Sequence, residues 1–93
     1  MEEFIYFIYT DDIPGVLHRI ASVFTRRKVN INSLNASPTA EAGISRFVVA
    51  VKADRDKLEK IAGQLKKIIE VKKVELHTSD EIIKQKAALL KKE

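Results

Sequence analysis

The stretch Asp11–Leu34 reads DDIPGVLHRIASVFTRRKVNINSL, and it joins an Asp-x-Pro-Gly loop to an amphipathic segment and then to a polar strand that opens with Asn30. Its middle part places apolar side chains at helical spacing and ends in three cations, which suit the negative end of a helix dipole. The stretch therefore predicts a loop, a helix and a strand in that order. The apolar stripe of the helix is Leu17, Ile20, Ala21 and Phe24.

Strand patterns lie on both sides of this helix. Phe4–Thr10 and Ile44–Val51 carry apolar side chains on both alternating faces, which is typical of strands buried on two sides. Val29–Ser37 alternates in polarity except at Leu34, which indicates either a side chain on the opposite face or a bulge. Pro38–Gly43 has the composition of a hairpin connection.

A second helix is predicted over Asp54–Ile69, followed by an alternating strand over Val71–Thr78. Asp12 and Asp54 are the expected N-caps of the two helices. Gly63, inside the second helix, costs about 1 kcal/mol relative to alanine, so we expect close packing there. The predicted stripe of this helix is Leu58, Ile61, Ala62, Leu65, Ile68 and Ile69.

The resulting order is β-α-β-β-α-β. Right-handed crossovers turn this order into a four-stranded antiparallel sheet with both helices on one face, an α+β fold of the ferredoxin-like type. Strand order 4-1-3-2 places the two doubly apolar strands in the centre. Because the helices cover only one face, we expect a second copy, a larger partner or the C-terminal tail to cover part of the other.

The folded domain is predicted over residues 1–78, with a C-terminal helical tail over residues 79–93. Thr78 and Glu81 match a capping box, which predicts the start of a short helix. An interaction helix and a frayed terminus are both open interpretations of the tail.

The composition narrows the class of protein. A chain of 93 residues has a thin core, so oligomerisation is a plausible supplement. The absence of cysteine excludes a disulfide framework and a thiolate metal site. The net charge of +4 is spread among acidic residues, which favours solvated helix faces over a nucleic-acid surface. No apolar run approaches the ~20 residues of a membrane span, so a cytoplasmic protein without membrane contact is expected.

The titratable residues give no catalytic pattern. Asp11 and Asp12 are neighbours along a loop, where turn and cap chemistry is the expected role. His18 and His77 lack metal-ligand spacing, and the sequence contains neither a phosphate loop nor a nucleophile elbow. We therefore expect no catalytic residues and no metal site.

The start of the first helix can bind a small ligand. Its first backbone amides are unpaired and attract a carboxylate, and Gly15 has no side chain to obstruct the approach. Asp12 could pair with an ammonium group, and Asn30 supplies donors and an acceptor. Together these groups can satisfy both charged ends of an amino acid. The same pattern also forms an ordinary helix start, so both interpretations stay open.

Several segments match a known pattern. On them the chain resembles the ACT domain, and more closely the regulatory (small) subunit of acetolactate synthase, also called acetohydroxyacid synthase, in its short single-domain form. The segments are Pro14–Ala21 (PGVLHRIA), Phe24–Arg27 (FTRR), Asn30–Leu34 (NINSL), Ser37–Thr39 (SPT) and Ser45–Phe47 (SRF).

The resemblance implies a homodimer, paired edge to edge through the second strand, that senses a branched-chain amino acid, chiefly valine, and mediates feedback inhibition of a catalytic large subunit. Thiamine diphosphate, FAD and Mg would belong to that large subunit. The implied effector site combines the helix start of one chain with the second strand of its neighbour. Its residues would be Asp12 and Asn30 as polar anchors, the Gly15, Val16 and Leu17 amides for the carboxylate, and the Val16 and Ile31 side chains for shape.

Two residues depart from the family pattern. The family usually has asparagine where this chain has Asp12, which implies a different effector affinity or choice. It usually has glycine where this chain has Lys28, so we expect the turn into the second strand to be built differently. Two alternatives stay open: a stand-alone ACT module that regulates another enzyme or a transcription factor, and an RNA-binding module. The latter lacks the expected glycines and second aromatic around Phe47.

Overall fold

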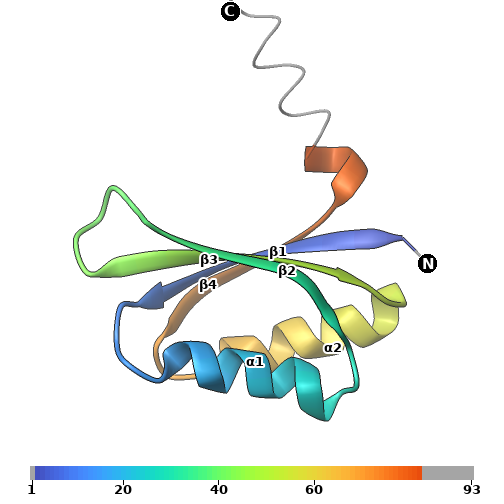
Figure 1. Ribbon diagram of the computed structural model, residues 1–93, viewed down its shortest axis with the longest axis horizontal. Helices are drawn as coiled ribbons and strands as arrows, with labels where there is room; N and C mark the ends of the chain where they lie inside the picture. Colours follow the sequence, from blue (N-terminus) through green and yellow to red (C-terminus); the bar gives the residue numbers. More distant parts are fainter. Residues whose placement is uncertain (1, 83–93) are drawn as a thin grey trace, which may run out of the picture.

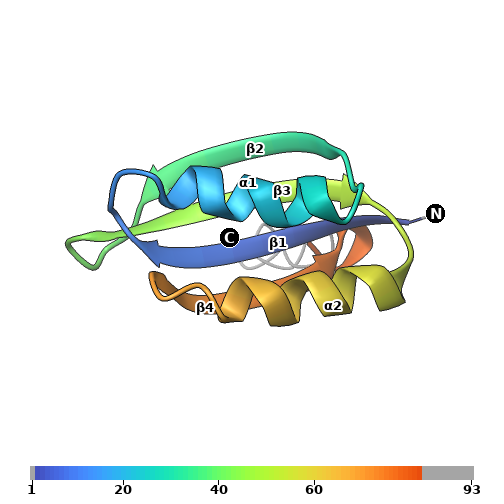
Figure 2. The ribbon, with the colours of Figure 1, turned by 90° about the horizontal axis from the view of Figure 1, so that it is seen from below.

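The computed structural model describes residues 2–82, and its elements follow the predicted β-α-β-β-α-β order. Both helices lie on one face of a single sheet (Figure 1), and from below β1 is visible between them (Figure 2). The elements are β1 (Glu3–Asp11), α1 (Val16–Arg26), β2 (Ile31–Pro38), β3 (Ile44–Lys52), α2 (Arg55–Lys66) and β4 (Val71–Thr78).

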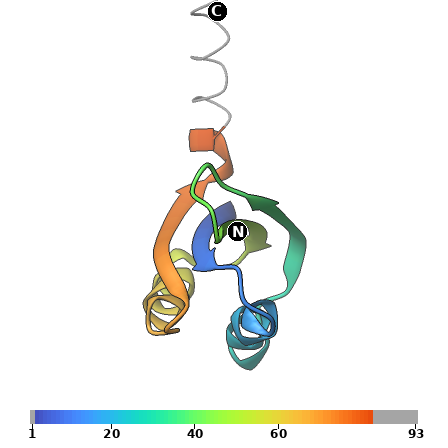
Figure 3. The ribbon, with the colours of Figure 1, turned by 90° about the vertical axis from the view of Figure 1, so that its left-hand side faces the viewer.

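The sheet has the strand order β2-β3-β1-β4 and is antiparallel throughout. The order confirms that the two doubly apolar strands are central. Even-numbered side chains of β1 are buried under the helices, while the odd-numbered ones are half-buried on the other side. We call that other side the open face, because neither α1 nor α2 covers it (Figure 3). By register the residues at its centre are Ile5, Phe7 and Tyr9 of β1, Arg46, Val48 and Ala50 of β3, and Lys73, Glu75 and His77 of β4.

Tyr6 is the side chain that joins the sheet to both helices. It is fully buried, and its ring meets the ring of Phe24 in α1 edge to face at 5.3 Å. Its hydroxyl donates a hydrogen bond of 2.6 Å to the carbonyl oxygen of Leu58 in α2. Burial raises the pKa of the Tyr6 phenol well above its usual value, so the group stays a neutral donor.

The start of α1 differs from the prediction. The cap position is held by Gly15, with φ of 88°, and no side chain caps the helix, so the expected Asp12 cap is wrong. The chain first makes a turn in which the Val16 amide donates to the Ile13 carbonyl, and this turn separates Asp12 from the helix. Glycine adopts this left-handed backbone without a steric penalty. Asp54 does occupy the N-cap of α2, but its side chain makes no cap hydrogen bond.

The end of α1 keeps the left-handed turn despite its lysine. Lys28 has φ of 59°, its amide donates to the Thr25 carbonyl, and the Val29 amide donates to the Phe24 carbonyl. These two bonds, with Phe24 and Val29 buried together, form a Schellman motif. The expectation of a different turn is therefore wrong. The chain accepts the strain of a lysine where glycine would fit better.

Some predicted core positions are also wrong. Leu17 is 43% exposed, because the helix turns Val16 into the core in its place. Ile69 is 89% exposed, because α2 ends at Lys66 and the chain leaves the helical face. The close packing expected at Gly63 is absent, since a Cβ added there would meet no atom within 4 Å.

A bulge sets the phase of β2. Its pairing with β3 shifts register between Ile31 and Ser33, so of the two alternatives that Leu34 left open the structure shows the bulge and not the opposite face. The extra residue, Asn32, lets both Ile31 and Leu34 pack against the core.

The end of β4 carries the predicted capping box. The Thr78 amide donates to the Glu81 carboxylate, and the Glu81 amide donates to the Thr78 hydroxyl, each at 3.2 Å. The bonds that the Thr78 amide and hydroxyl donate to this carboxylate hold the pKa of the Glu81 carboxyl below its ordinary value. Residues 79–82 are helical, and the rest of the predicted tail, 83–93, lies outside the described residues. Within the described part of the chain, no helix is long and apolar enough to span a bilayer.

The strain at Lys28 predicts that Lys28→Gly raises the free energy of unfolding by about 1 kcal/mol, because glycine adopts the left-handed backbone without a Cβ clash. Chemical denaturation of both proteins measures the change. The matched control is Lys60→Gly in the middle of α2, where glycine should lower stability by about 1 kcal/mol. A loss of stability in Lys28→Gly would contradict the strain assigned to this turn.

Candidate functional site

The predicted effector residues fall into two groups at opposite ends of α1. Asp12, Gly15, Val16 and Leu17 lie at its start, whereas Asn30 and Ile31 follow its end (Figure 2). The 11 residues of α1 separate the two groups by about 16 Å, at 1.5 Å per residue. One copy of the chain therefore does not bring the whole set together.

The start of α1 presents apolar side chains, though not the predicted one. Val16 is only 4% exposed and belongs to the core, so one copy of the chain does not present its side chain at the surface. Ile13 and Leu17 are 45% and 43% exposed and flank the turn instead. Ile13 was missed because a lone apolar residue in a loop has no periodic pattern to indicate its role.

Backbone donors accompany these side chains. The Val16 amide is used by the Ile13 carbonyl at 3.3 Å. Among the described residues, no backbone carbonyl accepts from the amides of Gly15 and Leu17. Two of the three predicted carboxylate-binding amides thus stay available at the positive end of the helix.

Asp12 lies beside this turn and against the β2–β3 hairpin, since its amide donates to the Gly43 carbonyl at 2.9 Å. Its neighbour Asp11 forms an ion pair with Lys72, with 3.3 Å between Oδ2 and Nζ. Asp12 itself has no cationic partner within residues 2–82. Its exposed carboxylate is therefore able to receive an ammonium group.

At the other end of α1, Asn30 lines a hollow of about 370 Å³. Three lysines also line it, and none has an acidic partner within 4 Å in the described chain. Their charge makes this end attractive to a carboxylate, a feature that the sequence analysis missed because the lysines come from three separate elements. They are Lys28 after α1, Lys52 at the end of β3 and Lys57 in α2.

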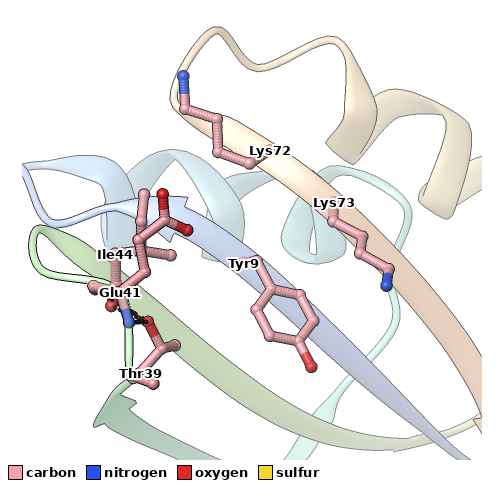
Figure 4. A pocket seen from close by; sticks show the side chains of 7 residues that line it. Tyr9, Thr39, Glu41, Ile44, Lys72 and Lys73 are labelled. Atoms are coloured by element: carbon pink, nitrogen blue, oxygen red, sulfur yellow. Dashed lines mark hydrogen bonds between the residues drawn. The ribbon is translucent and has the colours of Figure 1, made fainter.

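A larger hollow of about 500 Å³ lies elsewhere, between β1, β4 and the hairpin (Figure 4). Thr39 ties this hairpin, because its hydroxyl bonds to the Ile44 carbonyl at 2.9 Å and accepts from the Glu41 amide at 3.2 Å. The amino groups of Lys72 and Lys73 point away from each other in Figure 4 and are paired with Asp11 and Glu75. The hollow contains none of the predicted effector residues.

The two edges of the sheet differ in charge. The edge strand β2 reads INSLNASP and has no charged residue, whereas β4 reads VKKVELHT and has three besides a histidine. Charged side chains on an edge oppose the addition of another strand. Therefore β2 is the edge suited to pairing. Among the described residues, no group of three or more His, Cys, Asp or Glu side chains is placed to hold a metal ion.

Thr10 is a buried polar residue directly before the site loop. It is fully buried on the helix side of β1, and its hydroxyl has no hydrogen-bond partner in the described chain. The backbone that follows is tied on both sides, since the Asp11 amide donates to the Glu70 carbonyl at 2.8 Å and the Asp12 amide donates to the Gly43 carbonyl at 2.9 Å. An unpaired buried hydroxyl costs folding free energy.

A family model and the curated relatives of this chain point to the same family. The model of the "AHAS small subunit-like ACT domain" matches residues 8–73. The acetolactate synthase small subunit of Bacillus subtilis is 43% identical over 83% of this chain and 45% of its own length. That of Mycolicibacterium smegmatis is 37% identical over 90% of this chain and 49% of its own length.

Solved structures similar to this chain include a member of the same family. The crystal structure of the acetolactate synthase small subunit from Thermotoga maritima superposes with a TM-score of 0.75 at 34% identity, over 82% of this chain and 47% of that one. The ACT domain of GTP pyrophosphokinase from Chlorobium tepidum, at 24% identity and a TM-score of 0.66, shares the fold. The chain spans about half the length of the curated relatives it matches.

Thr10→Val should raise the free energy of unfolding by about 1 kcal/mol, because a methyl group replaces an unpaired buried hydroxyl of similar shape. Thermal and chemical denaturation measure it. The control is the same substitution at Thr78, which is also buried but caps the helix through Glu81; there we expect a loss of about 1 kcal/mol. Destabilisation by Thr10→Val would show that its hydroxyl has a partner in solution.

Proposed function

Since the chain belongs to the AHAS small subunit-like ACT domain family, we propose that it is a non-catalytic regulatory subunit of acetolactate synthase. In this proposal it binds a branched-chain amino acid, with valine as the first candidate, and mediates feedback inhibition of the catalytic large subunit. That large subunit would hold thiamine diphosphate, FAD and Mg and carry out the chemistry. The contribution of this chain is to sense the branched-chain amino acid and to change the geometry of its complex with the large subunit.

The separation of the effector residues is the observation that carries the proposal. A two-fold axis beside β2 reverses one copy relative to the other, so the start of α1 in one copy approaches the end of α1 in its partner. Asp12 and Leu17 would then face Asn30 of the partner subunit. Two equivalent effector sites result, and each needs both copies.

The uncharged β2 edge supports this arrangement. Antiparallel pairing of two β2 strands satisfies backbone groups that a single copy leaves to water, and it joins two sheets into one. The bulge lies near one end of β2 and Pro38 at the other. Ser33–Ser37 between them is the segment we expect to pair.

The charges fit a zwitterionic ligand. The free amides of Gly15 and Leu17 come from one copy and attract the carboxylate. Lys28, which follows α1 beside Asn30 in the other copy, adds a positive charge to the same site. Asp12 receives the ammonium group, and Asn30 adds a donor or an acceptor. Ile13, Leu17 and Ile31 provide apolar contact for a branched side chain. Selectivity between valine and either leucine or isoleucine would amount to only ~1–3 kcal/mol, the usual worth of one methylene.

A ligand that contacts both copies changes their association. Because it binds the dimer and not the separated chains, it stabilises the dimer by mass action. It also favours the relative orientation of the copies that closes the site, which is a physical route from amino-acid concentration to the catalytic partner.

Calorimetric titration of the chain with valine, leucine and isoleucine tests the sensor function. We expect saturable heat with at least one of them. Asn30→Ala should weaken that binding at least about tenfold, or about 1.4 kcal/mol, because a polar anchor of a charged ligand is lost. Gln64→Ala, which shortens an amide side chain on α2, should leave it unchanged. No heat with any of the three amino acids in the wild-type chain would refute the sensor proposal.

Sedimentation tests the dimer. Ala36→Lys places like charges near each other where two β2 strands pair, so we expect the dimer dissociation constant to rise at least about tenfold. Ala40→Lys in the exposed hairpin loop makes the same change away from that edge and should have no effect. Equal dimerisation of the two variants would exclude pairing through β2.

A further inference from the structure

The open face of the sheet combines apolar and cationic side chains in ordered rows. Phe7 lies at its centre, paired across the sheet with Val48 on one side and Glu75 on the other. The next row contains Arg46, Tyr9 and Lys73. Neither α1 nor α2 covers these rows (Figure 3).

Cationic side chains of the open face partly cover the aromatic rings on the same face. The Arg46 guanidinium lies 5.5 Å from the centroid of the Phe7 ring, and the Lys73 amine lies 5.8 Å from that of Tyr9. His77 meets Phe7 edge to face at 5.5 Å. These contacts explain how the sheet keeps Phe7 and Tyr9 half-buried without a covering layer.

Arg46 differs from the other cations on this face. Lys73 pairs with Glu75 at 2.9 Å, and His77 lies 3.6 Å from the same carboxylate. Arg46 has no acidic partner within residues 2–82, and its Nε is buried without a hydrogen-bond acceptor. A buried, unpaired donor on a charged group is costly. Because the guanidinium is a planar fork of donors, a carboxylate is the group that satisfies it best.

We propose that the open face is the docking surface for the catalytic large subunit, and that Arg46 receives a carboxylate from it. This inference rests on the proposed function, which supplies the identity of the partner. Arginine beside an aromatic ring, in a surface that is apolar at its centre and polar at its rim, is the composition of an interface hot spot.

A second copy fits the open face less well. The acidic residues that the register places on that face are Glu75, Glu3 and Asp11. Each already has a partner within residues 2–82: Lys73 and His77 engage Glu75, Ser79 donates to Glu3, and Lys72 pairs with Asp11. A copy would therefore bring further cations toward Arg46 and no free carboxylate. Pairing through β2 also leaves the open faces of both copies on one side of the joined sheet, where they present a single wide surface to a larger partner.

The experiment uses the full-length chain and the acetolactate synthase large subunit encoded in the same genome, with affinity measured by surface plasmon resonance. Arg46→Glu should raise the dissociation constant at least about tenfold, and Arg46→Gln, which keeps the size and removes the charge, should raise it less. The matched control is Lys60→Glu on the exposed side of α2, with an expected change below about twofold. Circular dichroism melts establish that each variant is folded.

The outcomes separate the two proposals. If the wild-type chain does not bind the large subunit, the proposed function fails and this inference fails with it. If the wild type binds and Arg46→Glu binds equally well, only the open-face interface is refuted. If Arg46→Glu instead dissociates the dimer in sedimentation while Lys60→Glu does not, the face contacts a second copy, which also overturns the inference.

Discussion

The burial of Tyr6 is the constraint on which the rest of the structure depends. Its ring contacts Phe24 of α1, and its hydroxyl bonds to the Leu58 carbonyl of α2. A phenol in a core needs a hydrogen-bond acceptor, so this bond fixes α2 relative to β1 at a defined depth. Both helices pack on the same face of the sheet, and α1 lies along that face. The start and the end of α1 are therefore held apart. The groups predicted to bind a ligand lie at those ends and take their positions from this packing.

The sequence predicted the architecture well where two signals agreed. Apolar residues on both faces of β1 and β3 indicated central strands, and the β-α-β-β-α-β order led to the same conclusion. The bulge near Leu34 was visible as a break in phase because strand periodicity tolerates no insertion. Helix ends were predicted less well. Asp12 has the right side chain for a cap, but the Pro14–Gly15 turn moves the helix start beyond its reach, and Lys28 adopts a backbone that residue preference disfavours.

The candidate site was predictable in outline and not in detail. The Asp-x-Pro-Gly pattern located the free amides. Asn30, predicted to open the strand, is exposed and lies one residue before β2, and its role as a polar anchor stays a prediction. Which of two adjacent apolar residues faces outward depends on the rotation of α1 about its axis. The core decides that rotation by taking Val16 and leaving Leu17 outside. The lysines around Asn30 were also beyond sequence reasoning, because tertiary packing alone brings three elements together.

The difference between the two edge strands limits how far the chain can polymerise. Adding a copy through β2 consumes the uncharged edge of both chains, so a joined sheet ends in β4 on either side. Each of these outer β4 strands carries Lys72, Lys73 and Glu75. Their charges would have to lose water or meet like charges before another strand could add. In the proposed dimer, growth would therefore stop at eight strands, and pairing through β2 would use up the edge that could otherwise seed a fibril. This distribution of charge would make the β2 interface self-terminating.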